Sequence, residues 1–159
     1  MTMGDSWGWG YIRHSQNFKT VTQLVQNLAY AAAGEGNYLL NIGPKPDGSV
    51  RKEERDRLAA LGKWLRVHGE AIYGTQRAPL EAGMLGLWTR KGDIGYLHVF
   101  DWPGSEVVVP AIKTRVKSAT LLTTKQRARV RQEHNGRLVL SGLPDTPPEL
   151  QEAMNLGIS

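Results

Sequence analysis

The sequence predicts an α/β segment followed by an antiparallel all-β region. In the first half, two amphipathic helical patterns flank a short apolar run, an order typical of α/β organisation. From about Gly86 onward the pattern changes to short runs separated by turn residues, which indicates an antiparallel sandwich or barrel. We expect the boundary between the two parts near residues 74–86.

The first helix is predicted over about Val21–Ala33. Thr20 and Gln23 have the spacing of a capping box, and Gly34 follows the last periodic residue. The apolar residues that recur with the spacing of one helix face are Val21, Leu24, Val25 and Leu28. We therefore expect this helix to bury one face.

The next run, Asn37–Ile42, is mostly apolar and does not alternate, as expected for a strand that is buried on both faces of a parallel sheet. The glycine- and proline-rich stretch 43–48 then predicts a loop. A second helix is expected over about Arg51–His68, because leucines fall on one face and charges on the other, and Gly69 supplies a stop signal.

The second half of the chain contains six short strand-like runs. They are Leu87–Thr89, Ile94–Phe100, Glu106–Val109, Ala119–Thr123, Arg127–Arg131 and Arg137–Leu140. Asn135-Gly136 between the last two is the strongest hairpin signal in the sequence. After Leu143 the chain loses strand character, so we predict a short helix or a frayed segment at its end.

Composition narrows the classes of protein. The 159 residues include no cysteine, which excludes a disulfide framework and a thiolate metal site. The longest apolar stretches are far below the roughly 20 residues of a membrane helix, and the first residues show neither a basic nor an apolar leader segment. We therefore expect a soluble chain without a signal peptide or a membrane partner, and the compartment stays unassigned.

The basic residues Arg127, Arg129 and Arg131 alternate, which places their side chains on one strand face beside Lys125. This pattern is compatible with a nucleic-acid or polyanion binding module through residues 125–131. A charged edge strand that resists pairing explains the same pattern. We favour the edge strand and expect no nucleic-acid partner, because no aromatic residues interleave with the basic ones to stack bases.

Cofactor and metal signals are absent from the sequence. The four histidines are widely separated, and no spacing presents two of them on one element face. Gly34-Glu35-Gly36 precedes a strand-like run rather than joining a strand to a helix, so it is not a phosphate loop. We predict neither a cofactor nor a metal site.

Three motifs in order carry a family resemblance. They are Thr2-Met3-Gly4-Asp5-Ser6-Trp7-Gly8-Trp9, Asn37-Tyr38-Leu39-Leu40-Asn41-Ile42-Gly43-Pro44 with Asp47-Gly48, and Trp64-Leu65 with Gly69-Glu70-Ala71-Ile72-Tyr73-Gly74-Thr75. Together they resemble the C-terminal third of α-L-fucosidases of glycoside hydrolase family 29, over roughly residues 1–143. The later run 97–103 resembles a strand and turn of that family's sandwich, whereas residues 144–159 depart from its closing strand.

The resemblance implies the last part of a distorted (β/α) barrel in residues 1–78 and a β-sandwich domain in residues 79–159. It also implies a retaining glycoside hydrolase that releases α-L-fucose from fucosylated glycans. In the family, both catalytic carboxylates and the fucose-binding histidines precede the segment matched here. We therefore expect this chain to be the C-terminal part of such an enzyme and to lack catalytic residues of its own.

The resemblance also nominates site residues. Barrel active sites lie at the carboxyl ends of strands, which would turn Asn41 toward the substrate. The family places an aromatic residue of the Ser-Trp-Gly segment beside the sugar's 6-methyl group. The candidates for substrate binding are Trp7, Trp9, His14 and Asn41. Asp5 and Glu35 do not match the family's catalytic motifs, and they are candidates for catalysis only if the isolated chain is an unusual enzyme.

Two further expectations concern the role and the partners of the chain. As an alternative to a role in an enzyme, the sandwich could be a non-catalytic carbohydrate-binding or support module. Its sugar platform would then consist of Trp88, Tyr96 and Trp102, although packing in the core explains these residues better. A partial barrel leaves strand edges and apolar faces uncovered. Besides a fucosylated oligosaccharide or glycoconjugate, we therefore expect a homo-oligomer or the missing barrel half as partner.

Overall fold

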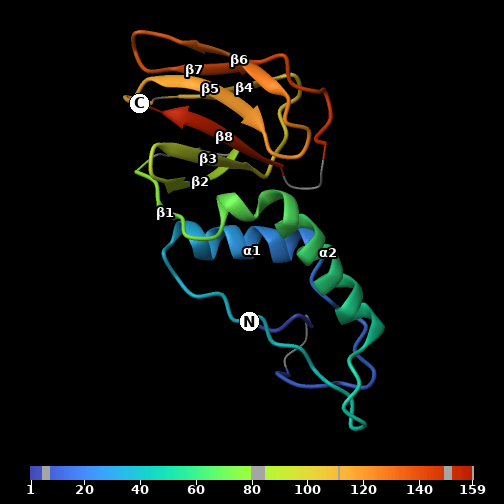
Figure 1. Cartoon of the computed structure of the whole chain (residues 1–159). Helices are drawn as coiled ribbons and strands as arrows, with labels where there is room; N and C mark the ends of the chain where they lie inside the picture. Colours follow the sequence, from blue (N-terminus) through green and yellow to red (C-terminus); the bar gives the residue numbers. More distant parts are fainter. Residues whose placement is uncertain (5–7, 80–84, 111, 149–151, 159) are drawn as a thin grey trace.

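Two helices pack on one side of a curled antiparallel sheet in the computed structural model (Figure 1). The structure describes residues 1–4, 8–79, 85–110, 112–148 and 152–158. The helices are α1 (Val21–Ala33), α2 (Lys52–His68) and the 3₁₀ helix η1 (Gly69–Ala71). The strands are β1 (Gln76–Arg77), β2 (Gly86–Lys91), β3 (Ile94–Val99), β4 (Glu106–Val109), β5 (Val116–Leu121), β6 (Arg127–Gln132), β7 (Leu138–Ser141) and β8 (Glu152–Ile158).

Both predicted helices are confirmed. The capping box of α1 is complete, because the Gln23 amide donates to Thr20 Oγ1 at 3.1 Å and the Thr20 amide donates to Gln23 Oε1 at 2.8 Å. The second helix, α2, begins one residue later than predicted. Its buried Leu61 and Trp64 pack against the apolar face of α1 and against the sheet. Burying side chains of this size contributes roughly 1.5–3 kcal/mol each.

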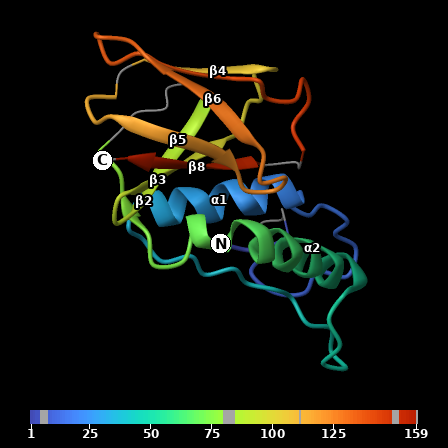
Figure 2. The ribbon, with the colours of Figure 1, turned by 45° about the horizontal axis from the view of Figure 1, so that its top comes forward.

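The antiparallel all-β part is confirmed as well. Neighbouring strands follow the order β1-β2-β3-β8-β5-β6-β7-β4, and every neighbouring pair is antiparallel. The first residues of β6 pair with β5, but its residues from Arg129 onward pair with β7. The sheet folds over at this point, so that β6, β7 and β4 lie across the other strands (Figure 2). The predicted hairpin joins β6 to β7, with Gly136 at φ 85°.

Strand β3 is buried on both faces, and it connects the two halves of the molecule. Leu97 and Val99 enter the core between the folded sheet layers. Tyr96 and His98 lie on the opposite face, where Tyr96 packs with Ala71 of η1. The sandwich core and the helical layer therefore share one strand as a common wall.

The predicted buried strand Asn37–Ile42 is wrong in extent. The described residues give it a single parallel bridge, between Thr2 and Asn41, and Leu39 is 75% exposed. The Met3 amide donates to the Asn41 carbonyl at 2.9 Å, but only a few residues of the N-terminal segment reach this edge. A parallel strand needs neighbours along both edges and cover on both faces. This segment has neither among the described residues.

The predicted end of the chain is also wrong, because residues 152–158 form strand β8 between β3 and β5. Its Met154 lies opposite both Leu97 of β3 and Leu121 of β5, and all three side chains are fully buried. Local sequence did not indicate a strand because asparagine and glycine have low β propensity. Burial between two existing strands overrides that propensity.

Two interpretations of individual side chains have different outcomes. The arginine-rich strand β6 is not an edge strand, since it lies between β5 and β7.

The packing role of the sandwich aromatics is confirmed for Trp88 and Tyr96, which are 3% and 2% exposed, respectively. Trp102 is partly buried and donates from its indole nitrogen to the Pro144 carbonyl at 2.9 Å. These rings do not form an exposed platform for a sugar.

Candidate functional site

A small cavity lies where the loop after Gly8, the segment ending at Gly43 and the first turn of α2 meet. The cavity is about 20 Å³, which is enough for about one water molecule but not for a sugar ring. Among the residues that line it are Trp9, Asn41 and Glu54. A sugar would therefore contact the outer side of this cluster rather than enter it.

Gly43 brings the loop and the α2 segment into direct contact. A Cβ atom at this position would lie 2.8 Å from the Tyr11 nitrogen and 2.9 Å from the Gly10 carbonyl carbon, so only glycine fits without moving the backbone. Asn41 Nδ2 donates a hydrogen bond to the Trp9 carbonyl next to this crossing. The segment 41–43 thus sets the position of the loop that carries Trp9, whose side chain is 70% exposed.

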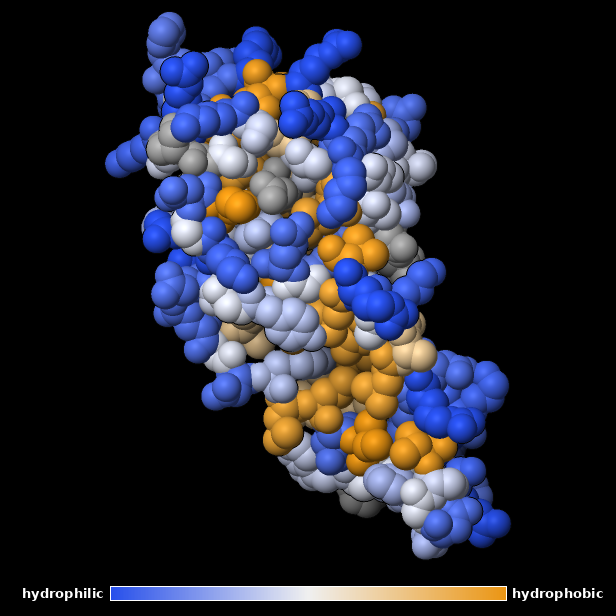
Figure 3. All heavy atoms as spheres, in the orientation of Figure 1, coloured by the Kyte–Doolittle hydropathy of each residue, from blue (hydrophilic) through white to orange (hydrophobic). Residues whose placement is uncertain are grey.

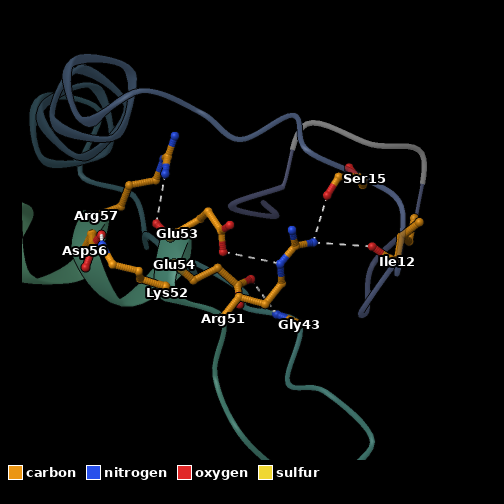
Figure 4. Close-up of polar contacts among 9 residues, drawn as sticks. All are labelled: Ile12, Ser15, Gly43, Arg51, Lys52, Glu53, Glu54, Asp56 and Arg57. Carbon is orange, nitrogen blue, oxygen red and sulfur yellow. Dashed lines mark hydrogen bonds and ion pairs between the residues drawn. The ribbon is translucent and has the colours of Figure 1, made fainter.

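Glu54 supports Gly43 from the helix side. It lies in the first turn of α2, is 3% exposed, and its Oε1 accepts a hydrogen bond from the Gly43 amide at 2.9 Å (Figure 4). A carboxylate in the first turn also interacts favourably with the positive end of the helix dipole. This arrangement ties the loop cluster to a rigid helix.

Arg51, the N-cap residue of α2, fixes the other side of the cluster. Its Nη1 donates to the Ser15 carbonyl at 2.8 Å and to the Ile12 carbonyl at 3.4 Å (Figure 4). The guanidinium also lies 4.7 Å from the centroid of the Phe18 ring and 3.6 Å from a carboxylate oxygen of Glu53. Because Arg51 is 8% exposed, these contacts replace its hydration.

Comparison with known proteins identifies the origin of this arrangement. A sequence model of the α-L-fucosidase family matches residues 1–70. The tissue α-L-fucosidase of Bos taurus is 31% identical over 149 residues, which are 91% of this chain and 32% of that protein. The human tissue enzyme is 33% identical over 155 residues, with the same two shares.

Solved structures agree with the sequence comparison. The whole chain superposes on 39% of α-L-fucosidase isoenzyme 1 from Paenibacillus thiaminolyticus, with a TM-score of 0.91 and 27% identity. It superposes equally completely on 37% of a family 29 α-L-fucosidase from Bacteroides thetaiotaomicron, with a TM-score of 0.89 and 31% identity. The chain is homologous to the C-terminal part of family 29 α-L-fucosidases.

The fucosidase homology confirms the family resemblance and extends it. The chain spans about a third of the length of the curated fucosidases it matches. The structural match covers the whole chain, so it includes the C-terminal strand β8, which the sequence motifs did not reach. None of the described helices is long and apolar enough to cross a membrane.

The structure brings together only some of the residues nominated from the sequence. Asn41 and Trp9 line the cavity, whereas His14 is exposed and is not among the lining residues. Asp5 and Trp7 lie outside the described residues. Glu35, at φ 55° after the C-terminus of α1, accepts a hydrogen bond from the Arg77 amide of β1 at 3.3 Å, and it does not line the cavity.

Arg51 and Glu54 were missed by sequence analysis. In the sequence they are two of several charged residues in a helix whose charged face is expected to be solvated. Their place directly after the glycine- and proline-rich loop 43–48 is the signal that could have found them, because side chains in a first helical turn face the preceding loop. Their burial depends on the long-range contact with residues 8–18.

A second polar cluster lies between the helices and the sheet. His68 Nε2 is 3.1 Å from Thr123 Oγ1, and His98 Nε2 is 3.0 Å from Thr89 Oγ1. The pKa of each imidazole is lowered to about 4, chiefly by burial, and the charge of Lys125 contributes to the shift at His68. Within the described ranges, no group of three or more His, Cys, Asp or Glu side chains is placed to hold a metal ion.

Proposed function

We propose that this chain is the C-terminal part of a retaining α-L-fucosidase that releases α-L-fucose from fucosylated glycans. The observation that carries the proposal is the superposition of the whole chain on fucosidase structures, with a TM-score of 0.91 for the Paenibacillus enzyme. The Bacteroides enzyme has been trapped as a covalent intermediate with 2-fluoro-fucosyl fluoride. A covalent glycosyl intermediate is the mark of the retaining mechanism.

The retaining mechanism requires two carboxyl groups about 5 Å apart, one as nucleophile and one as acid and base. Among the described residues that line the cavity, Glu54 is the only carboxylate, and its Oε1 is bonded to the Gly43 amide. We infer that the catalytic pair lies in the part of the fucosidase sequence that this chain does not match. The role left to this chain is to hold the sugar and to position the loop that contacts it.

The exposed Trp9 indole is the described side chain best suited to contact fucose. A flat apolar ring can pack against the 6-methyl group and the adjacent C–H groups of the sugar. Asn41 already donates its side-chain amide to the Trp9 carbonyl, so it acts by holding the loop. We keep Trp7 as a further proposed contact on the strength of the family motif, and we keep His14, an exposed loop residue, as another.

The surface of the helical half supports the expectation of a covering partner. Apolar atoms gather there in Figure 3, whereas the sandwich half is mostly hydrophilic. Trp9, Tyr30 and Leu39 are 70%, 60% and 75% exposed. We propose that residues 1–78 complete a (β/α) barrel whose other strands cover this surface, and that residues 79–159 form the sandwich domain. A second copy of the chain is the alternative occupant.

The proposal is tested by complementation. The chain would be mixed with the part of the Paenibacillus enzyme that it does not match, and hydrolysis of 4-nitrophenyl α-L-fucoside would be followed, with the β-anomer as control substrate. We expect no turnover from either piece alone and α-specific turnover from the mixture. Association of the two pieces without turnover, or turnover by the isolated chain, would contradict the proposed division of the site.

A further inference from the structure

The two oxygens of the Glu54 carboxylate are in different situations. Oε1 accepts the hydrogen bond from the Gly43 amide. Oε2 is buried from solvent and has no hydrogen-bond partner among the described residues. A buried carboxylate oxygen without a donor is unfavourable, so native proteins almost always supply one. The arrangement therefore points to a donor that is not part of the described chain.

The cavity beside Glu54 has the size and lining for such a donor. Its volume of about 20 Å³ accommodates about one water molecule. Thr2, Ser15 and Asn41 also line it, and their polar atoms offer the additional hydrogen bonds that a buried water needs. A sugar ring is too large for this space. A water molecule is the hydrogen-bond donor that fits this cavity.

Glu54 is mechanically connected to the loop that carries Trp9. Its Oε1 fixes Gly43, and the backbone of the loop crosses Gly43 so closely that a Cβ would lie 2.8 Å from the Tyr11 nitrogen. Two residues earlier, Asn41 donates to the Trp9 carbonyl. Any shift of the Glu54 carboxylate would therefore move the support on which the loop rests.

We propose that Glu54 is a positioning residue for the Trp9 loop and that its Oε2 accepts a hydrogen bond from one buried water in the cavity. The importance of the loop for a sugar rests on the proposed function. The hydrogen-bond arrangement does not, because it can be measured without turnover. Failure of one is thus distinguishable from failure of the other.

The experiment uses NMR on the full chain and on three variants. Glu54→Leu removes both oxygens, and Glu54→Gln keeps one acceptor for the Gly43 amide but replaces the other oxygen with a donor. Asp56→Asn, at an exposed carboxylate of the same helix, is the matched control. The readouts are the exchange rate of the Gly43 amide and the NOE between that amide and a long-lived water.

In the unchanged chain we expect a protected Gly43 amide and a water NOE. Glu54→Leu should abolish the NOE and speed exchange at Gly43 roughly 10- to 100-fold, as expected for the loss of a hydrogen bond to a charged group. Glu54→Gln should keep Gly43 protected but weaken the water NOE, and Asp56→Asn should change neither. In a reconstituted fucosidase, Glu54→Leu should raise KM, because the loop that carries Trp9 loses its support.

Three results would overturn the proposal. The first is the absence of a long-lived water next to Gly43 in the unchanged chain. The second is acceleration by Glu54→Leu that is equally large at the Leu24 amide of α1, because it would report global unfolding rather than a local support. The third result is an unchanged water NOE in Glu54→Gln, because the chemical change at Oε2 would then have no effect. This result decides the question even if Glu54→Leu does not fold.

Discussion

The buried histidine cluster predicts that the chain loses stability in mild acid. Folding lowers the pKa of His68 and His98 from 6.5 to about 4, chiefly through burial. The folded state therefore disfavours the charged imidazole, and the unfolded chain binds more protons than the folded chain between about pH 6.5 and pH 4. The free energy of unfolding must fall as the pH falls through this window, and the loss is complete below pH 4.

The size of the effect follows from the two pKa values. At pH 5 an unfolded imidazole is almost fully protonated while the folded one is still mostly neutral, which costs about 2 kcal/mol per histidine. The pair then removes about 4 kcal/mol, a large part of the roughly 5–15 kcal/mol that stabilises a typical domain. Asp47 and Glu53, whose pKa values are lowered, act only at more acidic pH.

Urea unfolding followed by far-UV circular dichroism at pH 7.5 and pH 5 measures this loss. His68→Gln keeps a polar partner for Thr123 but does not titrate, so it should reduce the loss to about 2 kcal/mol. His134→Gln, at an exposed histidine of the β6–β7 hairpin, should leave it at about 4 kcal/mol. Equal stability at the two pH values, or an equal effect of both substitutions, would refute the assignment to the buried pair.

Three further predictions concern the loop, the last strand and the sugar contact. Gly43→Ala should destabilise the chain by about 1–3 kcal/mol, because the added Cβ meets the backbone of residues 10 and 11. Gly62→Ala should stabilise the chain by about 0.5–1 kcal/mol, because the space around Gly62 in α2 is open. Urea unfolding measures both changes. Leu156→Ala should cost about 2–5 kcal/mol in the same assay, and a loss below about 0.5 kcal/mol would contradict the central place of β8. Trp9→Ala should change the free energy of unfolding by less than about 0.5 kcal/mol yet raise KM in the complemented fucosidase, and unchanged kinetics would remove Trp9 from the sugar site.

Local sequence signals predicted the elements that depend on local interactions. The capping box of α1, the valine run of β4 and the Asn135-Gly136 hairpin act within a few residues, and the structure forms all three where they were expected. Strand β8 was missed because its stability comes from β3 and β5, more than 30 residues away along the chain. Local β propensity is a weak guide where such long-range contacts determine whether a strand forms.

The candidate site was predicted only where a family motif covered it. Asn41 and Trp9 were found from their motifs, and the structure places both at the cavity. The only local signal of Arg51 and Glu54 is their place after the loop 43–48, and it is a weak one, since a charged residue in a first helical turn is ordinarily solvated. Only the crossing of the loop over Gly43 buries them, and that contact joins segments more than 30 residues apart.

Helix α2 connects the candidate site with the buried histidine cluster. Its first turn carries Glu54 beneath the Trp9 loop, and its last residue, His68, is buried against Thr123 after β5. Seventeen helical residues span about 25 Å, so the helix acts as a rigid strut between the sandwich and the candidate site. The sandwich then contributes to the site without touching it, because it holds one end of the strut whose other end supports Gly43. Acid that charges His68 should therefore loosen the Gly43 amide before the chain unfolds. Amide exchange near pH 4, where the folded imidazole titrates, that stays uniform along α2 and at Gly43 would refute this coupling.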